Sequence, residues 1–329
     1  MADLKLGNYL RLRLLHINEL PSHAGLESSI ENPEADQGPI DRPSLHVFIT
    51  SILEEAYHFT KANVSQFTSH GSKKSPPSTS PVELLTQSYS RELEHVSWQD
   101  PKLPRKWSGH GPANAEHWFA RRSHHTNSSE EGTATLSEFD YGTRRDHPER
   151  EKDYTPDLYD CAEILNYNDQ IHEEFGFEGK LSSTSGEFTD VQMSVQEMCH
   201  QLPFGLYNRC FSVLVITAKG PLQDELLVVQ LPVDISSFTA AFYSNKRNLK
   251  EGKDKLQKKQ VILGMYVSVE RVRILSDSNI EWLMATASDA KGWLPMWMQR
   301  LGVPGAVVKD VGLLMEWIKK PRQQGLIKD

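Results

Sequence analysis

The 329-residue sequence predicts an α+β fold in which a curved antiparallel sheet wraps around a long C-terminal helix. Five strand candidates follow one another over residues 188–288. One of them, 191–196, alternates apolar and polar residues as a half-buried antiparallel strand does. An apolar stripe at helical spacing follows and ends near Pro321. One terminal helix can cover the bare face of a bent sheet, and this helix-grip arrangement encloses either a cavity or a fully packed core.

Composition excludes several classes of protein. Apolar residues make up 38% and charged residues 24%, and the net charge of -8 gives no overall basic surface for nucleic acid. Three cysteines without a Cys-x-x-Cys pair predict a reducing compartment. No apolar run reaches the roughly 18 residues of a membrane span, and the N-terminus lacks the pattern of a signal peptide. We therefore expect a soluble, cytoplasmic protein.

The first 114 residues are expected to form extra N-terminal helices and loops. Helical spacing of apolar residues predicts three helices, over 1–20, 45–59 and 82–96. Two stretches rich in Pro, Ser, Gly and charge predict mobile loops, at 21–43 and 70–81.

The pattern changes at residue 115, where we place the start of a helix-grip domain that spans 115–320 and leaves a tail at 321–329. Strands are predicted over 117–125 and 133–140, and a helix over 153–175. The segment 144–160 holds four basic and six acidic residues. Such mixed charge is typical of a solvated face rather than of a site.

The later elements complete the predicted sheet and its helix. Denser apolar runs predict further strands over 209–218, 225–233, 261–269 and 280–288. Pro295 suits the first turn of the last helix, and Gly302–Gly305 with its proline is expected to interrupt or kink that helix.

Short motifs resemble START-like lipid-binding proteins of the birch-pollen-allergen superfamily. Leu202-Pro203 followed by Asn208-Arg209 is similar to the start of that family's central strands. Asp289 through Pro295 resembles the turn that launches the START C-terminal helix. The upstream part resembles a fungal branch of START-like proteins, and the shared residues are Trp118, Arg121, Arg122, Ser123, His124, Glu138, Phe139, His147, Glu151, Tyr154, Thr155 and Pro156. The resemblance implies a deep cavity for one apolar or sterol-like molecule and no metal, nucleotide or other cofactor.

Five polar residues are candidates for orienting or transforming such a molecule: Arg121, Arg209, Tyr266, His200 and Tyr207. Each has a structural alternative. A buried arginine pairs with an acidic residue, for which Glu138, Asp140 and Glu281 are available. Tyr266 shares a face with Ser268 and Glu270, and that face lines the cavity or meets solvent. His200 and Tyr207 flank Pro203, at a cavity mouth or in a surface loop, and a neutral histidine there could act as a general base.

Apolar residues of the strands and the last helix are expected to bound the cavity, or to pack as core. They are Trp118, Val213, Val229, Met265, Trp282, Trp297, Leu301, Val308, Val311 and Met315. The segment 246–259 holds seven basic and two acidic residues. It is a solvated loop or a site of transient contact with an anionic membrane surface.

Three functions stay open on these observations. The first is a carrier that binds a sterol, an acyl chain or a polyketide- or terpenoid-type molecule. The second is a cofactor-independent cyclase, isomerase or pericyclase of secondary metabolism (a Diels–Alderase-like enzyme), which needs only to hold a substrate in a reactive geometry. The third is an interaction protein with a filled interior. The P-loop, GxGxxG, HExxH and GxSxG motifs are all absent from the sequence.

Overall fold

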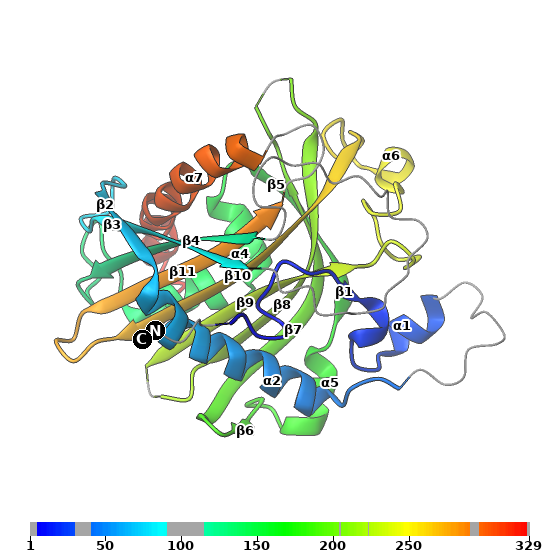
Figure 1. The fold of residues 1–329 in the computed structure, drawn as a ribbon, viewed down its shortest axis with the longest axis horizontal. Helices are drawn as coiled ribbons and strands as arrows, with labels where there is room; N and C mark the ends of the chain where they lie inside the picture. Colours follow the sequence, from blue (N-terminus) through cyan, green and yellow to red (C-terminus); the bar gives the residue numbers. More distant parts are fainter. Residues whose placement is uncertain are drawn as a thin grey trace.

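A computed structural model describes residues 5–29, 41–90, 115–203, 205–222, 224–289 and 296–327. Its centre is one large, strongly bent sheet (Figure 1). In spatial order the main strands are β2 (Thr68–Lys73), β3 (Val82–Ser90), β4 (Ala115–His125), β11 (Ile280–Asp289), β10 (Val261–Ile274), β9 (Glu225–Asp234), β8 (Asn208–Lys219), β7 (Gly186–His200) and β5 (Leu158–Asn166). Neighbours along this path are antiparallel.

Short strands and helices complete the chain. β1 (Leu15–His16) pairs in parallel with β9, and β6 (Leu181–Ser183) pairs with β7. The α-helices are α1 (Ala24–Ser29), α2 (Leu45–His58), α3 (Leu136–Phe139), α4 (His147–Tyr154), α5 (Asn168–Phe175), α6 (Asn248–Glu251), α7 (Met296–Trp317) and α8 (Lys319–Gln323). Short 3-10 or π turns are η1 (Ile17–Glu19), η2 (Phe59–Asn63), η3 (Val64–Gln66) and η4 (Asp140–Arg144). No helix in the described ranges is long and apolar enough to cross a membrane.

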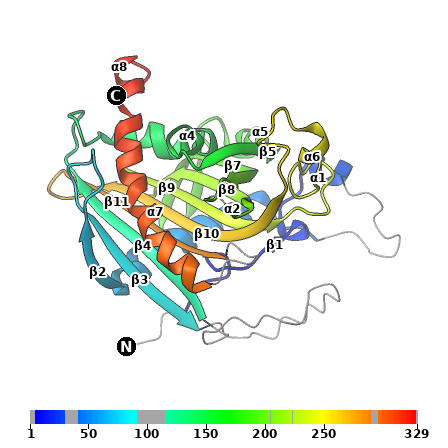
Figure 2. The same ribbon diagram turned by 90° about the horizontal axis from the view of Figure 1, so that it is seen from above.

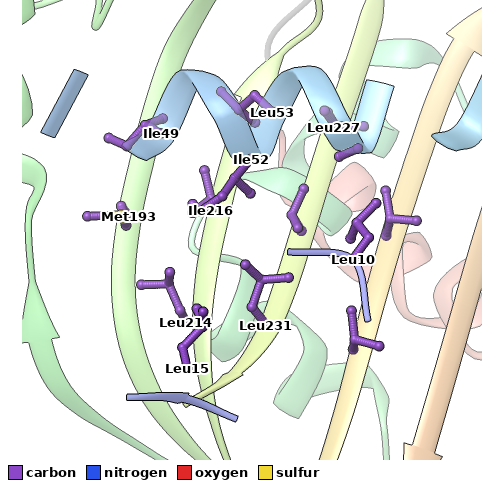
Figure 3. Packing of buried hydrophobic residues seen from close by; sticks show 14 of the residues in the cluster. Leu10, Leu15, Ile49, Ile52, Leu53, Met193, Leu214, Ile216, Leu227 and Leu231 are labelled. Carbon is purple, nitrogen blue, oxygen red and sulfur yellow. The ribbon is translucent and has the colours of Figure 1, made fainter. Parts of the chain in front are cut away.

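Helices cover both faces of the sheet. On the outer face, Ile49, Ile52 and Leu53 of α2 pack against strand residues such as Ile216 and Leu227 (Figure 3). On the opposite, inner face lie α4 and α7, and α7 runs past β4 and β11 inside the bend of the sheet (Figure 2). This is the helix-grip arrangement that the sequence predicts.

Helix α7 is continuous from Met296 to Trp317, with Pro304 inside it. Of the two outcomes expected at Gly302–Gly305, an interruption or a kink, the interruption is therefore wrong. Tertiary packing explains the difference, because Val307, Val308 and Val311 of α7 are buried in one apolar cluster with β3, β10 and β11. Burial of this stripe outweighs the local preference of glycine and proline to end a helix.

Several N-terminal expectations are also wrong. Residues 5–14 form no helix, and the backbone N–H groups of Asn8, Tyr9 and Leu10 donate instead to the carboxylate of Glu55. The helix expected over 82–96 is strand β3 as far as Ser90, and residues 91–96 lie outside the described ranges. Since β2 and β3 pair onto β4, residues 68–90 belong to the same sheet as the rest of the chain.

The stretch 70–81, expected to be a mobile loop, is part strand and part turn fixed to α7. The Oγ of Ser75 donates to the carbonyl of Val308 at 2.6 Å and accepts from the N–H of Gly312 at 2.9 Å. A Cβ on Gly312 would lie 2.4 Å from the carbonyl oxygen of Pro76, so glycine is needed for this close approach. Residues 30–40 of the other expected loop lie outside the described ranges.

Two middle segments differ for local reasons. The strand expected over 133–140 is helix α3, which begins with a capping box between Thr135 and Glu138. The helix expected over 153–175 divides into the end of α4, strand β5 and helix α5. Pro156 accounts for the first break, because a proline disfavours helical geometry in the residue before it.

Candidate functional site

Two apolar clusters on the inner face leave a polar band between them. The first cluster joins α7 to β3, β10 and β11, and includes Trp282. The second consists of Leu158, Met198, Val213 and Val215 on β5, β7 and β8. The strands between the clusters carry polar side chains on this face. The candidate site is therefore a polar strip of the sheet with an apolar cluster on either side.

Strand register explains why these polar residues share a face. Ser268 lies opposite Gln230 of β9, and Glu270 lies opposite Met284 of β11, which is itself opposite Arg121 of β4. Side chains at i and i+2 of a strand point the same way, so Ser268 and Glu270 face inward together.

Arg121 is held by an aromatic ring and a carboxylate. Its side chain is 1% exposed, and its guanidinium lies 3.8 Å from the centre of the Trp282 ring. Its Nη2 lies 3.5 Å from Oε2 of Glu270, and the Trp282 Nε1–H donates to the same oxygen at 2.8 Å. Its Nε and Nη1 have no hydrogen-bond partner among the described residues.

Helix α4 contributes a second charged pair. His147 Nδ1 lies 2.5 Å from the carbonyl oxygen of Thr143, and its Nε2 lies 3.3 Å from Oε2 of Glu151 and contacts the Gln230 amide. Burial alone would lower the pKa of His147, but the hydrogen bond and charge of Glu151 raise it above the ordinary value. Burial likewise opposes ionisation of Glu151, yet the bond from His147 lowers the pKa of that carboxyl. Each member of the pair therefore stabilises the charged form of the other.

Asp310 brings a third carboxyl from α7. Burial raises its pKa to about 7, the charge of Arg121 opposes the shift, and the charges of Glu151 and Glu270 add to it. Burial also raises the pKa of the Tyr154 hydroxyl well above its usual range, with a further increase from the same three carboxylates. Asp310 and Tyr154 thus lie within electrostatic reach of both charged pairs.

Neither Asp310 nor Tyr154 makes a side-chain hydrogen bond or ion pair within the described part of the chain, although Tyr154 is only 8% exposed. The side chains of Glu151 and Glu270 keep 24% and 16% of their surface accessible. These groups of the inner face are therefore desolvated but still partly accessible. We therefore define the central polar cluster as Arg121, Glu270, His147, Glu151, Tyr154 and Asp310.

Comparison with known families assigns the chain. A family model described as "Protein of unknown function (DUF3074)" matches residues 118–318. The chain belongs to the DUF3074 family. A search of curated proteins gives no match.

Solved structures similar to this DUF3074 chain come from human proteins. STARD10 aligns with a TM-score of 0.47 at 11% identity over 90% of this chain and 86% of its own. StAR-related lipid transfer protein 5 aligns with a TM-score of 0.49 at 11% identity over 84% and 97%. The lipid transfer and protein localization domain of StarD13 aligns with a TM-score of 0.39 at 10% identity over 80% and 95%. Likeness at this level does not extend to a ligand or an activity.

The predicted polar residues of the DUF3074 chain fall into two groups. Arg121 belongs to the central polar cluster, and its acidic partner is Glu270 rather than Glu138, Asp140 or Glu281. Tyr266 lies on the inner face, half-buried, with its ring 5.2 Å from that of Phe211.

The other three predicted polar residues lie near the starts or ends of β7 and β8. His200 lies 5.5 Å from the Phe211 ring, and burial lowers its pKa. Arg209 donates to the carbonyl of Tyr207, and the Tyr207 side chain is exposed. Tyr207 therefore lies outside the enclosed part of the inner face.

The predicted apolar residues divide between the two faces. Trp282, Val308, Val311 and Met315 lie in the inner cluster with α7, and Val213 lies in the second inner cluster. Trp118 and Val229 instead pack on the outer face with α2, and the alternation of β10 places Met265 on that side with Val267. These three therefore lie on the face opposite Val213 and the α7 residues, because the side chains of a strand alternate between its two faces. The side chains of Trp297 and Leu301 lie outside the described residues.

A half-open pocket of about 380 Å³ adjoins the central polar cluster. It lies between the first turn of α4 and strands β5, β7 and β8, and His147 belongs to both sites. Its walls include Gln196 and Thr217, whose Oε1 and Oγ1 are buried without a hydrogen-bond partner in the described ranges. A polar pocket that is open to solvent therefore lies next to the central polar cluster on the inner face.

Of the six members of the cluster, sequence reasoning identified only Arg121 as a site residue and missed the other five. His147, Glu151 and Tyr154 appear only as marks of the family resemblance, within a segment interpreted as solvated. Asp310 gave a weak signal of its own, since it lies three residues after Val307 on an otherwise apolar helix face. A charge in such a stripe is costly to bury, which is the physical reason to suspect a function there.

Proposed function

We propose that the chain binds one small molecule with a large apolar part between the inner face of the sheet and α7. The observation that carries the proposal is a set of polar groups on the inner face without a hydrogen-bond partner among the described residues: the buried Nε and Nη1 of Arg121, the Tyr154 hydroxyl and the half-buried carboxyl of Asp310. Buried polar groups in proteins nearly always have a partner. A polar atom of a bound molecule would supply it.

The apolar clusters on either side suit the rest of such a molecule. Val308, Val311 and Met315 of α7 form one wall, and Val213 and Met198 form the other. Burying about 300 Å² of apolar ligand surface contributes roughly 7 kcal/mol before the cost of association. Sterols, acyl chains and polyketide- or terpenoid-type molecules offer this much surface with few polar atoms.

Native mass spectrometry of the purified chain tests the proposal. We expect one noncovalent adduct per chain that is released on denaturation. If the purified chain carries no adduct, it should still bind N-phenyl-1-naphthylamine, an uncharged fluorophore whose fluorescence increases in apolar sites. A chain that carries no adduct and leaves this fluorophore dark would contradict the proposal.

A cofactor-independent cyclase or isomerase is the second candidate, favoured by the carboxyl of Asp310. Burial places its pKa at about 7, so it can both give and take a proton near neutral pH. Such an enzyme changes the shape of its substrate without changing its mass. Molecules extracted from the wild type and from Asp310→Asn should then differ in chromatographic retention, whereas a carrier would yield the same molecule from both.

Transient membrane contact through residues 246–259 is a further proposal. Six lysines of this segment are exposed: Lys246, Lys250, Lys253, Lys255, Lys258 and Lys259. Each can contribute about 1 kcal/mol at an anionic surface. Cosedimentation with phosphatidylserine vesicles, but not with phosphatidylcholine vesicles, supports the proposal, and equal cosedimentation with both would contradict it.

A further inference from the structure

We propose that the polar end of the bound molecule is an amine, protonated at neutral pH, which donates hydrogen bonds to the carboxylate of Asp310. This inference rests on the proposed function and adds the chemical class of the ligand's polar group. Three observations support it. One carboxyl of the central polar cluster has no cationic partner, the guanidinium of Arg121 is covered by the Trp282 ring, and the Tyr154 hydroxyl near Asp310 makes no hydrogen bond among the described residues.

The central polar cluster has three carboxyl groups but only two cationic side chains to pair with them. Arg121 pairs with Glu270 at 3.5 Å, and His147 pairs with Glu151 at 3.3 Å. Asp310 has no cation within 4.0 Å in the described part of the chain. The side chain of its neighbour Lys309 is exposed, and the charge of Lys309 has only a small effect on Asp310, after those of Arg121, Glu151 and Glu270. A buried carboxylate without a counter-ion is costly, so a cationic group of a ligand would be stabilised here.

An anionic ligand group fits the same site poorly. The guanidinium of Arg121 is the cation that a carboxylate or phosphate would need, but it is 1% exposed and covered by the Trp282 ring. The accessible polar surface belongs instead to Glu151, Glu270 and Asp310, all hydrogen-bond acceptors when ionised. The accessible polar groups of the inner face are therefore acceptors, whereas the two unpartnered N–H groups of Arg121, at Nε and Nη1, are buried beneath them.

An amine matches these acceptors better than an alcohol does. An ammonium group has three donors and a full positive charge, whereas a hydroxyl has one donor and none. The Tyr154 hydroxyl, which feels the charges of Glu151, Glu270 and Asp310 but bonds none of them, can accept a second ammonium hydrogen. Charge-assisted bonds of this kind are about twice as strong as neutral ones.

The pairing predicts how affinity changes with pH. The charged and titratable groups near Asp310 are Arg121 on β4, Glu270 on β10, Glu151 and Tyr154 on α4, and Lys309 on its own helix, and burial raises the pKa of Asp310 to about 7. An amine stays protonated up to about pH 10 and binds the ionised carboxylate. Its affinity should therefore rise about tenfold from pH 6 to pH 8. Loss of the His147 proton over this range would act in the same direction, so the Asp310 variant is needed to separate the two.

Displacement of N-phenyl-1-naphthylamine by three probes of equal chain length tests the inference. The probes are dodecylamine, dodecanol and dodecanoate, each used below its micelle concentration at pH 6 and pH 8. Dodecylamine should bind about tenfold more tightly than dodecanol at pH 8. Asp310→Asn should abolish that preference and the pH dependence while leaving dodecanol binding within about threefold. Glu316→Gln, which removes an exposed carboxylate from the same helix, should change neither.

The outcomes separate this inference from the proposed function. Displacement by dodecanol or dodecanoate at least as effective as by dodecylamine overturns the amine and keeps the binding site. An amine preference that survives in Asp310→Asn overturns the role of Asp310. Failure of the fluorophore and of all three probes to bind overturns the proposed function itself.

Discussion

Replacing Asp310 with asparagine should stabilise the protein, and the gain should grow with pH. Burial on the inner face raises the pKa of this carboxyl from 3.8 to about 7. Because the folded pKa lies above the unfolded value, the contribution of the group to stability is fully present below pH 3.8 and is lost as pH rises through about 7. At 1.36 kcal/mol per pKa unit, ionisation lowers the free energy of unfolding at pH 8 by up to about 4 kcal/mol. An amide avoids this loss.

Urea unfolding at pH 5, 6, 7 and 8 measures the effect. The free energy of unfolding of Asp310→Asn should exceed that of the wild type by roughly 1–2 kcal/mol at pH 5 and by up to about 4 kcal/mol at pH 8. Glu316→Gln, whose side chain is 63% exposed on the same helix, should stay within about 0.5 kcal/mol at every pH. An asparagine variant less stable than the wild type at pH 8, or a gain independent of pH, would refute the argument that Asp310 is desolvated and unpaired. A protein retains a carboxyl that lowers its free energy of unfolding this much when the carboxyl serves its function.

Two further predictions concern α7 and α4. Gly312→Ala should destabilise the protein by on the order of 1–3 kcal/mol, because the new Cβ would lie 2.4 Å from a backbone carbonyl that cannot move away. Gly305→Ala in the same helix meets nothing within 4 Å and should stabilise by about 0.5–1 kcal/mol, so equal thermal shifts for the two variants would argue against this packing. In Glu151→Gln the pKa of His147 should fall, because burial lowers it and the hydrogen bond and charge of Glu151 no longer oppose that effect, which leaves only the charge of Glu270 and the Thr143 carbonyl to raise it. An NMR titration of the imidazole measures it, and an unchanged pKa would remove Glu151 as the partner of His147.

The sequence predicts the helices and strands that bury only one of their faces, because their apolar residues then recur at the spacing of a helix or a strand. The alternation over 191–196 and the stripe of α2 correspond to real elements, because each places its apolar residues on one face. Strand β3 was expected to be a helix because its apolar residues face both layers of core. Val82 and Leu84 point to α7, whereas Leu85 and Tyr89 point to α2. A two-sided strand lacks the alternation that identifies a strand.

The candidate site is less predictable because its residues are far apart in the sequence. Arg121 was identified by its cost of burial in a strand. Its partner Glu270 follows from the register of β10 and β11, which local patterns do not fix. His147 and Glu151 lie in a segment rich in both charges, where composition cannot separate buried pairs from solvated ones. Only the packing of η4 and α4 against the sheet distinguishes them.

Binding of N-phenyl-1-naphthylamine to the wild type and to Ser268→Phe tests the central claim most directly. Ser268 is 8% exposed on the inner face, between Gln230 and Thr286, so a phenyl ring there would occupy the proposed binding space. We expect one bound fluorophore per wild-type chain, and an affinity at least about tenfold weaker for Ser268→Phe with an unchanged circular dichroism spectrum. Thr68→Phe on the exposed edge strand β2 should bind as the wild type does. Equal binding by the wild type and Ser268→Phe, or no binding by the wild type, would contradict a ligand site between the sheet and α7.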